Sequence, residues 1–127
     1  MIVLDASVLI AYLDAEHVHH SDAETLLLDA ADDEFGANSL TMAEVLVVPA
    51  RTGRLPETLR ALDDLEVREL PFPHDVALRL ADLRATTGLK MPDCCVLLAA
   101  EDATARIATF DSRLKRGAAD RGIPIME

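Results

Sequence analysis

The feature that most limits the possible folds is one carboxylate inside an apolar run near the start of the chain. Residues 2–10 read IVLDASVLI, and Asp5 is the charged residue among them. A buried ionised group without a partner has a large unfavourable desolvation energy, or it takes up a proton and becomes neutral. The fold must therefore bring other groups to Asp5 from elsewhere in the sequence.

The hydrophobic pattern alternates between short strands and helices along the whole chain. Apolar runs predict strands over 2–5, 34–38, 67–70, 105–110 and 123–126. Helical spacing of apolar residues predicts helices over 7–14, 21–31, 39–48, 54–65, 74–88, 93–103 and 112–120. This alternation predicts an α/β fold with three α/β/α layers around a central, mostly parallel sheet of about four to five strands.

Single residues set the expected ends of several helices. Ser21 and Ser39 stand where N-caps are expected, and Pro92 stands where a first-turn proline begins a helix. Pro49 is expected to bend or end the helix over 39–48. Gly88 is expected to end the helix over 74–88 as a C-cap glycine.

The length and composition predict one domain over residues 1–127 with a single core. No apolar run approaches the length of about 20 residues that spans a bilayer, and the start shows no basic leader, so we expect a cytoplasmic chain with no membrane contact. Cys94 and Cys95 are adjacent, and on a helix they point about 100° apart, which is poor geometry for a disulfide. Both are expected to be reduced core residues.

Four acidic residues from distant parts of the chain are predicted to meet at one edge of the sheet. Asp5 and Asp111 each follow a strand, and the carboxyl ends of parallel strands form the ligand-binding edge of open α/β sheets. Asp93 lies in the first turn of the helix that precedes the strand 105–110. This helix runs antiparallel to the strand, so its first turn lies at that same edge. Glu44 lies little more than one turn into the helix that follows 34–38. We therefore expect their oxygens to gather around a shared site.

Each of these acids also has a purely structural interpretation. Asp5 and Asp111 as N-caps would each contribute about 1 kcal/mol. Asp93 beside a helix dipole would contribute about 0.3 to 1 kcal/mol. Glu44 fits this interpretation less well, unless it pairs with a buried arginine, because its neighbours at helical spacing form an apolar face of Leu40, Thr41, Val47 and Val48.

Clustered carboxylates favour a hard divalent cation. Their mutual repulsion raises their pKa values until a cation neutralises them, and oxygen ligands select Mg²⁺, with Mn²⁺ as a possible substitute. Zinc is disfavoured because all four histidines fall in predicted loops or helix starts away from the acids: His17, His19, His20 and His74. The first three are expected to form a solvated polar turn. A metal held this way suits phosphoester hydrolysis by activated water.

Four short segments resemble the PIN-domain ribonucleases, and more closely the VapC-type toxins of bacterial toxin–antitoxin modules. They are VLDAS, AEVL, PDCCVLLAA and ATFDSRL, in the family's order and spacing across essentially the whole chain. Leu114 departs from the family, which often has an aromatic residue there. The resemblance implies a PIN-like fold in which metal is bound by Asp5, Glu44, Asp93 and Asp111, with the hydroxyls of Ser7 and Thr109 orienting water, metal or a carboxylate.

The resemblance also implies an activity and partners. A VapC-type toxin is an Mg²⁺-dependent endoribonuclease, a hydrolase of phosphodiester bonds in single-stranded or loop RNA. It forms homodimers and is inhibited by a cognate antitoxin whose tail occupies the active site. The RNA target, the number of metal ions and the antitoxin's identity do not follow from the sequence.

The net charge of −11 argues against a polyanionic partner, because affinity for nucleic acid usually scales with basic groups. Bound cations would offset this charge locally. Four basic residues flank the last two acids and are candidates for RNA backbone contact, or else an ordinary solvated helix end: Lys90, Arg113, Lys115 and Arg116. Aromatic residues make up only 3% of the chain, so we expect base stacking to be a minor resource.

Two other functions fit part of the pattern. A receiver-like regulatory domain also has an acidic Mg²⁺ pocket, but it needs a lysine at the end of a late strand, and 105–111 and 123–127 carry none. A PIN-like interaction module that cuts nothing has the same segments. Cleavage assays with and without Mg²⁺ separate this module from a nuclease.

Overall fold

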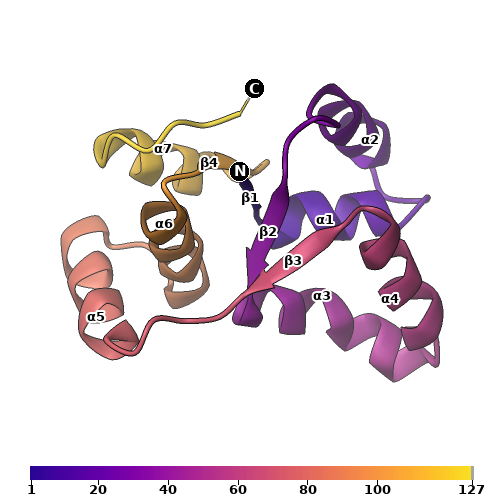
Figure 1. The fold of residues 1–127 in the computed structure, drawn as a ribbon, viewed down its shortest axis with the longest axis horizontal. Coiled ribbons are helices and arrows are strands. Elements are labelled where there is room, and N and C mark those ends of the chain that lie inside the picture. The colour runs from indigo at the N-terminus through magenta and orange to yellow at the C-terminus, as the bar shows by residue number, and fades with distance from the viewer. Residues whose placement is uncertain (127) are drawn as a thin grey trace.

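The computed structural model describes residues 1–126 and contains alternating strands and helices (Figure 1). The strands are β1 (Ile2–Leu4), β2 (Phe35–Asn38), β3 (Val67–Leu70) and β4 (Arg106–Ala108). The helices are α1 (Ala6–Leu13), α2 (His20–Asp29), α3 (Ser39–Thr52), α4 (Leu55–Asp64), α5 (Val76–Thr87), α6 (Met91–Ala103) and α7 (Ser112–Asp120).

All four strands are parallel and lie in the order β3-β2-β1-β4. β1 is central: Ile2 pairs with Phe35 of β2 on one side and with Arg106 of β4 on the other. The predicted α/β fold with a mostly parallel sheet of four to five strands is confirmed, with four strands in the sheet. Because every strand runs the same way, the residues that follow β1 and β4 emerge at the same edge.

Two apolar clusters cover the two faces of the sheet. Ile2 and Leu4 of β1 belong to the cluster formed with α1, α2 and α3, whereas Val3 belongs to the cluster formed with α5, α6 and α7. This division follows from the alternation of side chains along a strand. Figure 1 shows the corresponding layers, with α5, α6 and α7 on one side of β1 and the first four helices on the other. Leu114 and both cysteines are buried.

Several helix ends differ from the sequence prediction. The predicted caps Ser21 and Ser39 lie inside helices; α2 begins at His20, and the Asn38 side chain caps α3 by accepting from the Thr41 amide at 2.9 Å. Pro49 does not end α3, which continues to Thr52 before Gly53 at φ 72°. A proline inside a helix removes one hydrogen bond, and the three remaining residues of α3 tolerate that loss.

The strand predicted over 123–126 is only an isolated bridge between Ile125 and Ile107. Pro124 accounts for this, since it lacks the amide hydrogen that a longer parallel ladder needs. No helix within residues 1–126 combines the length and the apolar composition required to cross a bilayer.

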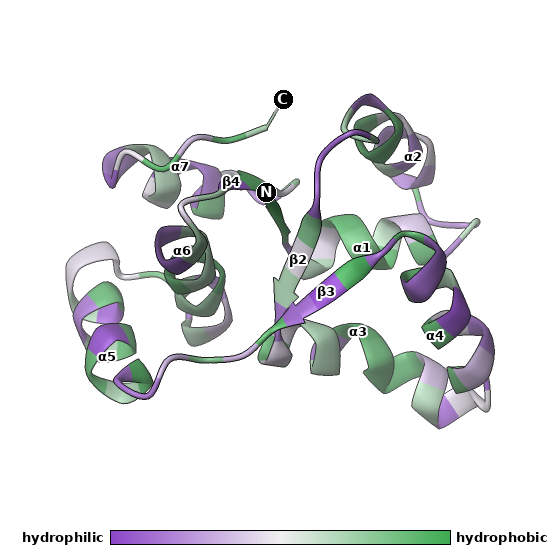
Figure 2. Cartoon of the chain, viewed as in Figure 1, coloured by the Kyte–Doolittle hydropathy of each residue, from purple (hydrophilic) through white to green (hydrophobic). Residues whose placement is uncertain are grey.

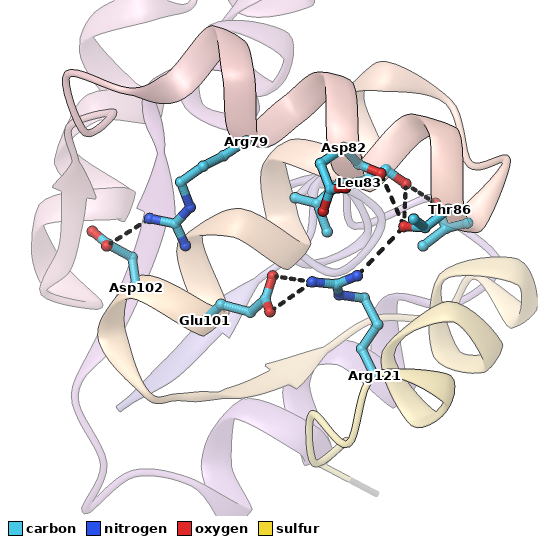
Figure 3. Close-up of polar contacts among 8 residues, drawn as sticks. Arg79, Asp82, Leu83, Thr86, Glu101, Asp102 and Arg121 are labelled. Atoms are coloured by element: carbon cyan, nitrogen blue, oxygen red, sulfur yellow. Dashed lines mark hydrogen bonds and ion pairs between the residues drawn. The ribbon is translucent and has the colours of Figure 1, made fainter.

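One arginine joins the three helices of the second face (Figure 3). Arg121, just after α7, donates from Nη2 to both carboxylate oxygens of Glu101 on α6, at 3.0 and 3.2 Å, and from Nη1 to the Thr86 hydroxyl on α5 at 3.4 Å. Arg79 on α5 adds an ion pair of 3.2 Å with Asp102 on α6. These contacts fix α6 and α7 relative to each other, and the N-terminal ends of both helices carry candidate site residues.

Candidate active site

Asp5 directly follows β1 and is only 8% exposed. Its backbone amide donates to the Ala108 carbonyl at 3.0 Å, which continues the pairing of β1 with β4. Its Oδ2 accepts hydrogen bonds of 2.7 Å from the hydroxyls of both Ser7 and Thr109. The groups that stabilise this buried carboxylate are therefore two hydroxyls, and its Oδ1 accepts no hydrogen bond from any residue in 1–126.

The same two hydroxyls also organise the turn between β4 and α7. Thr109 Oγ1 accepts from the Asp111 amide at 3.0 Å, and Ser7 Oγ accepts from the Phe110 amide at 3.1 Å. Because each hydroxyl donates its one proton to Asp5, the network orients that carboxylate relative to Asp111. Ser7 and Thr109 thus contact a neighbouring carboxylate, one of the roles expected for them.

Asp111 is the N-cap of α7. Its Oδ1 accepts from the amides of Arg113 and Leu114 at 2.8 and 3.3 Å. The capping interpretation is therefore correct for Asp111, whereas Asp5 occupies the cap position of α1 without a capping bond. Capping engages one oxygen of Asp111, and the other accepts no hydrogen bond within residues 1–126.

Asp93 lies in the first turn of α6 and is partly exposed. Burial raises its pKa from 3.8 to about 6, with further contributions from the negative charges of Asp111, Asp5 and Glu44, and Lys90 opposes this shift. Burial and the charge of Asp5 likewise raise the pKa of Glu44. Asp93 is thus close enough to the other three acids for their charges to act on it, and Glu44 is close enough to Asp5.

Glu44 is exposed and lies on α3 among the apolar residues that the sequence placed around it. Of its neighbours on α3, Val47 and Val48 are 46% and 61% exposed. Figure 2 shows this middle part of α3 in the hydrophobic colour, so the apolar face is real but it faces solvent. The buried side of α3 is formed by Thr41, Met42 and Val45 instead.

The carboxylates at this edge have no cationic partner in the described part of the chain. Within residues 1–126, none of the four forms an ion pair. Nor does that range contain three or more His, Cys, Asp or Glu side chains arranged to hold one metal ion together. The expected shared ligand cage is therefore not preformed among these residues. The all-oxygen donor set fits Mg²⁺, which usually takes one or two carboxylates and keeps several waters.

Comparison with protein families agrees with this arrangement of elements. The PIN domain family matches residues 2–120 of the chain. The chain belongs to the PIN domain family. The match includes all four acids, both hydroxyls and every strand. No curated protein matches the chain.

Solved structures share this PIN fold at low sequence identity. A toxin–antitoxin complex from Klebsiella pneumoniae has 22% identity and a TM-score of 0.75, with 88% of each chain covered. VapC20 of Mycobacterium tuberculosis, a toxin that cleaves the sarcin–ricin loop, has 15% identity and a TM-score of 0.75, covering 91% of this chain and 94% of that one. VapBC2 from Rickettsia felis, bound to promoter DNA, has 16% identity and a TM-score of 0.74, covering 100% and 98%.

The predicted RNA-contacting residues of this PIN domain lie just before α6 and along α7. Lys90 is the residue before α6, and its charge acts on Asp93. Arg113 and Arg116, with Arg121, line a cavity of about 430 Å³ between α7 and the end of α5. Lys115 is partly buried on the same helix. Within residues 1–126 none of the four predicted residues is held in an ion pair.

One aromatic feature beside the site goes beyond the sequence prediction. The solvated polar turn expected over His17 to His20 is largely present, with His19 exposed, and in addition the His19 ring lies 5.5 Å from the Phe110 ring between centroids. His20 instead contacts the Ala11 carbonyl through Nδ1 at 2.9 Å and lies near Tyr12. A histidine turn far from residue 110 in sequence predicts no such contact.

Proposed function

We propose that this PIN domain is a divalent-metal-dependent endoribonuclease that acts as the toxin of a toxin–antitoxin module. The observation that carries the proposal is an acidic edge of the sheet: Asp5 after β1 and Asp111 before α7 share the Thr109 hydroxyl, the charges of both raise the pKa of Asp93 on α6, and that of Asp5 raises the pKa of Glu44 on α3. None of these acids forms an ion pair within residues 1–126. A fold that gathers uncompensated negative charge loses stability, so the arrangement is explained by a cation that binds there. The acidic oxygens favour Mg²⁺, with Mn²⁺ as a substitute.

The four acids have distinct tasks in this proposal. Asp5 is fixed by Ser7 and Thr109 so that one oxygen stays available, and Asp111 keeps one oxygen free while it caps α7. Asp93 and Glu44 supply the remaining carboxylates from α6 and α3. When bound, a divalent ion would activate water and stabilise charge on the phosphoryl oxygens of RNA.

The basic residues around α7 support a nucleic-acid substrate despite the net charge of −11. Arg113 and Arg116 line one cavity together with Arg121, and Lys90 and Lys115 lie at the start of α6 and on α7. Basic groups that face one surface attract backbone phosphates. In the proposed complex they hold the RNA backbone on the side of the acids where α6 and α7 begin. Hydrolysis there leaves a 5′-phosphate and a 3′-hydroxyl.

An apolar groove next to Glu44 supports a protein partner. It has a volume of about 610 Å³ and runs between α1, α3 and α4, with Ile10 and Val48 exposed in it. Large exposed apolar residues that gather in one groove are typical of protein interaction sites. A cognate antitoxin that enters this groove would bring its tail to the acids. Homodimerisation and a cytoplasmic location remain predictions.

The test is an RNA cleavage assay on purified protein. We expect single-stranded RNA to be cut in Mg²⁺ and to stay intact in EDTA, and we expect Asp93→Asn to abolish cutting. The matched control is Asp64→Asn, at the exposed end of α4, which should cut like the wild type. A folded wild-type protein that cuts no RNA in either Mg²⁺ or Mn²⁺ would instead support the non-catalytic interaction module.

A further inference from the structure

Three rings form a row that begins beside the four acids. The centroids of the His17 and His19 rings are 5.9 Å apart with 41° between the planes, and those of His19 and Phe110 are 5.5 Å apart with 36°. The two histidines lie in the loop between α1 and α2, and Phe110 follows β4. We call these three residues the aromatic row.

The row is connected to the hydrogen-bond network of Asp5. Phe110 lies between Thr109, which donates to Asp5, and Asp111. The Phe110 amide donates at 3.1 Å to the Ser7 hydroxyl, which itself donates to Asp5 at 2.7 Å. The backbone of Phe110 is therefore part of the network that holds Asp5, and Phe110 is the residue directly before Asp111.

The rings are held in place without a ligand. The His19 amide donates to His17 Nδ1 at 3.0 Å, and His19 Nδ1 lies 3.3 Å from a carboxylate oxygen of Asp22. Phe110 is partly buried and packs on the apolar cluster below it, whereas the His19 side chain is 51% exposed. A preordered, half-exposed ring loses little conformational entropy when a flat ligand stacks on it.

We propose that the aromatic row is a stacking platform for an unpaired nucleobase adjacent to the RNA phosphate held at the acids. This inference rests on the proposed ribonuclease function and adds a requirement for single-stranded RNA at that position. Unpaired bases stack on Phe and His side chains, and stacking tolerates a negatively charged protein because it needs no basic group. It also assigns a role to one of only three phenylalanines in the chain.

The test measures RNA binding in Ca²⁺ in place of Mg²⁺, so that a divalent ion that prefers oxygen ligands offsets the charge of the acids, and a gel verifies that the RNA stays uncut. Fluorescence anisotropy of a labelled single-stranded RNA oligonucleotide gives Kd for the wild type, His19→Ala and His19→Tyr. We expect His19→Ala to raise Kd about tenfold and His19→Tyr to restore it, because a stacking site needs a ring rather than an imidazole. The matched control is His74→Ala, at an exposed position before α5, which should leave Kd unchanged.

A second comparison separates stacking from a structural effect on the loop. Oligonucleotides with an abasic site at each position in turn should show one position where removal of the base weakens binding to the wild type but not to His19→Ala. Phe110→Leu keeps an apolar side chain on the core and should behave like His19→Ala. Thermal melts of each variant verify that it is folded.

The failures of the two proposals differ. A wild type that cuts RNA, with His19→Ala binding RNA as tightly as the wild type, overturns the platform and leaves the ribonuclease function in place. The platform is also overturned if His19→Tyr binds as weakly as His19→Ala while both are folded. A wild type that neither binds nor cuts RNA overturns both proposals.

Discussion

Thr109 donates a 2.7 Å hydrogen bond to the carboxylate of Asp5, a residue 104 positions earlier in the chain. The bond joins the ends of β4 and β1, which pair along their lengths, and Thr109 is almost completely buried. One hydroxyl thereby holds Asp5 in place and also accepts from the Asp111 amide. The positions of two acids depend on this single side chain.

Thr109→Val should therefore impair both stability and cleavage. Valine has the same shape but leaves Asp5 and the Asp111 amide each short of one hydrogen bond, which should cost about 1 to 3 kcal/mol of unfolding free energy. Thr109→Ser keeps the hydroxyl and should retain most activity. Urea unfolding and RNA cleavage rates check both variants, and a Thr109→Val protein that cuts RNA at the wild-type rate contradicts the positioning role.

Substitutions at Asp111 should separate its two roles. Asparagine is a good N-cap but carries no charge, so Asp111→Asn should keep near wild-type stability and lose cleavage. Asp111→Ala removes the cap as well and should lose about 1 kcal/mol of stability in addition. Chemical denaturation compares the two proteins. Equal stabilities for both variants would show that the cap contributes nothing.

The raised pKa of Asp93 predicts an unusual pH dependence of stability. Its pKa is 3.8 when unfolded and about 6 in the fold, so between these values the native state binds more protons than the unfolded state. Stability should therefore fall as pH rises through this interval, and the loss is complete above it. After allowance for solvent screening of this partly exposed group, the loss is about 1 kcal/mol.

Asp93→Asn removes this penalty. In EDTA at about pH 7.5 we expect the variant to melt about 3 to 5 °C above the wild type, and the difference should become small near pH 3.5, where Asp93 of the wild type is mostly protonated in both the folded and the unfolded state. Differential scanning calorimetry across this pH range is the measurement. A variant that is less stable than the wild type at neutral pH contradicts the carboxylate repulsion.

Addition and removal of metal should change stability through the same acids. An ion that binds the native state at a concentration of 100 times its Kd adds about 2.7 kcal/mol to the unfolding free energy. Mg²⁺ or Mn²⁺ should therefore raise the melting temperature of the wild type, and EDTA should reverse the rise. In Asp5→Asn the rise should be much smaller, and an equal rise in both proteins places the ion elsewhere.

The order of elements and the placement of Asp5 and Asp111 at one sheet edge were predictable because they depend on local periodicity and on parallel topology, whereas the shared ligand cage expected of all four acids is not formed within residues 1–126. Asp5 follows β1 and Asp111 follows β4, and adjacent parallel strands leave such residues together. The dual role of Asp111 was not separable in advance, since an aspartate before a helix has the same sequence pattern whether it caps, binds a cation or does both.

Other features depend on tertiary context that the sequence does not encode locally. The sequence predicted the apolar face around Glu44 but not that Val47 and Val48 face solvent, because an exposed apolar face has the same composition as one that contacts the core. The contact between His19 and Phe110 joins residues far apart in the chain and has no periodic pattern. The strand over 123–126 is reduced to one bridge because Pro124 has no amide hydrogen to donate. The apolar pattern predicted a strand there because hydrophobicity alone does not include hydrogen-bond donors.

Anomalous diffraction from crystals soaked in Mn²⁺ at about pH 7.5 would show directly whether a cation binds between the acids. We expect an anomalous peak at the sheet edge, within coordination distance of oxygens from at least two of Asp5, Asp93 and Asp111, and no peak there in Asp93→Asn crystals. The proposed metal site would be contradicted if the acids at the sheet edge were well ordered in wild-type crystals and showed no anomalous peak, while Mn²⁺ ions were bound at other positions in the same crystals.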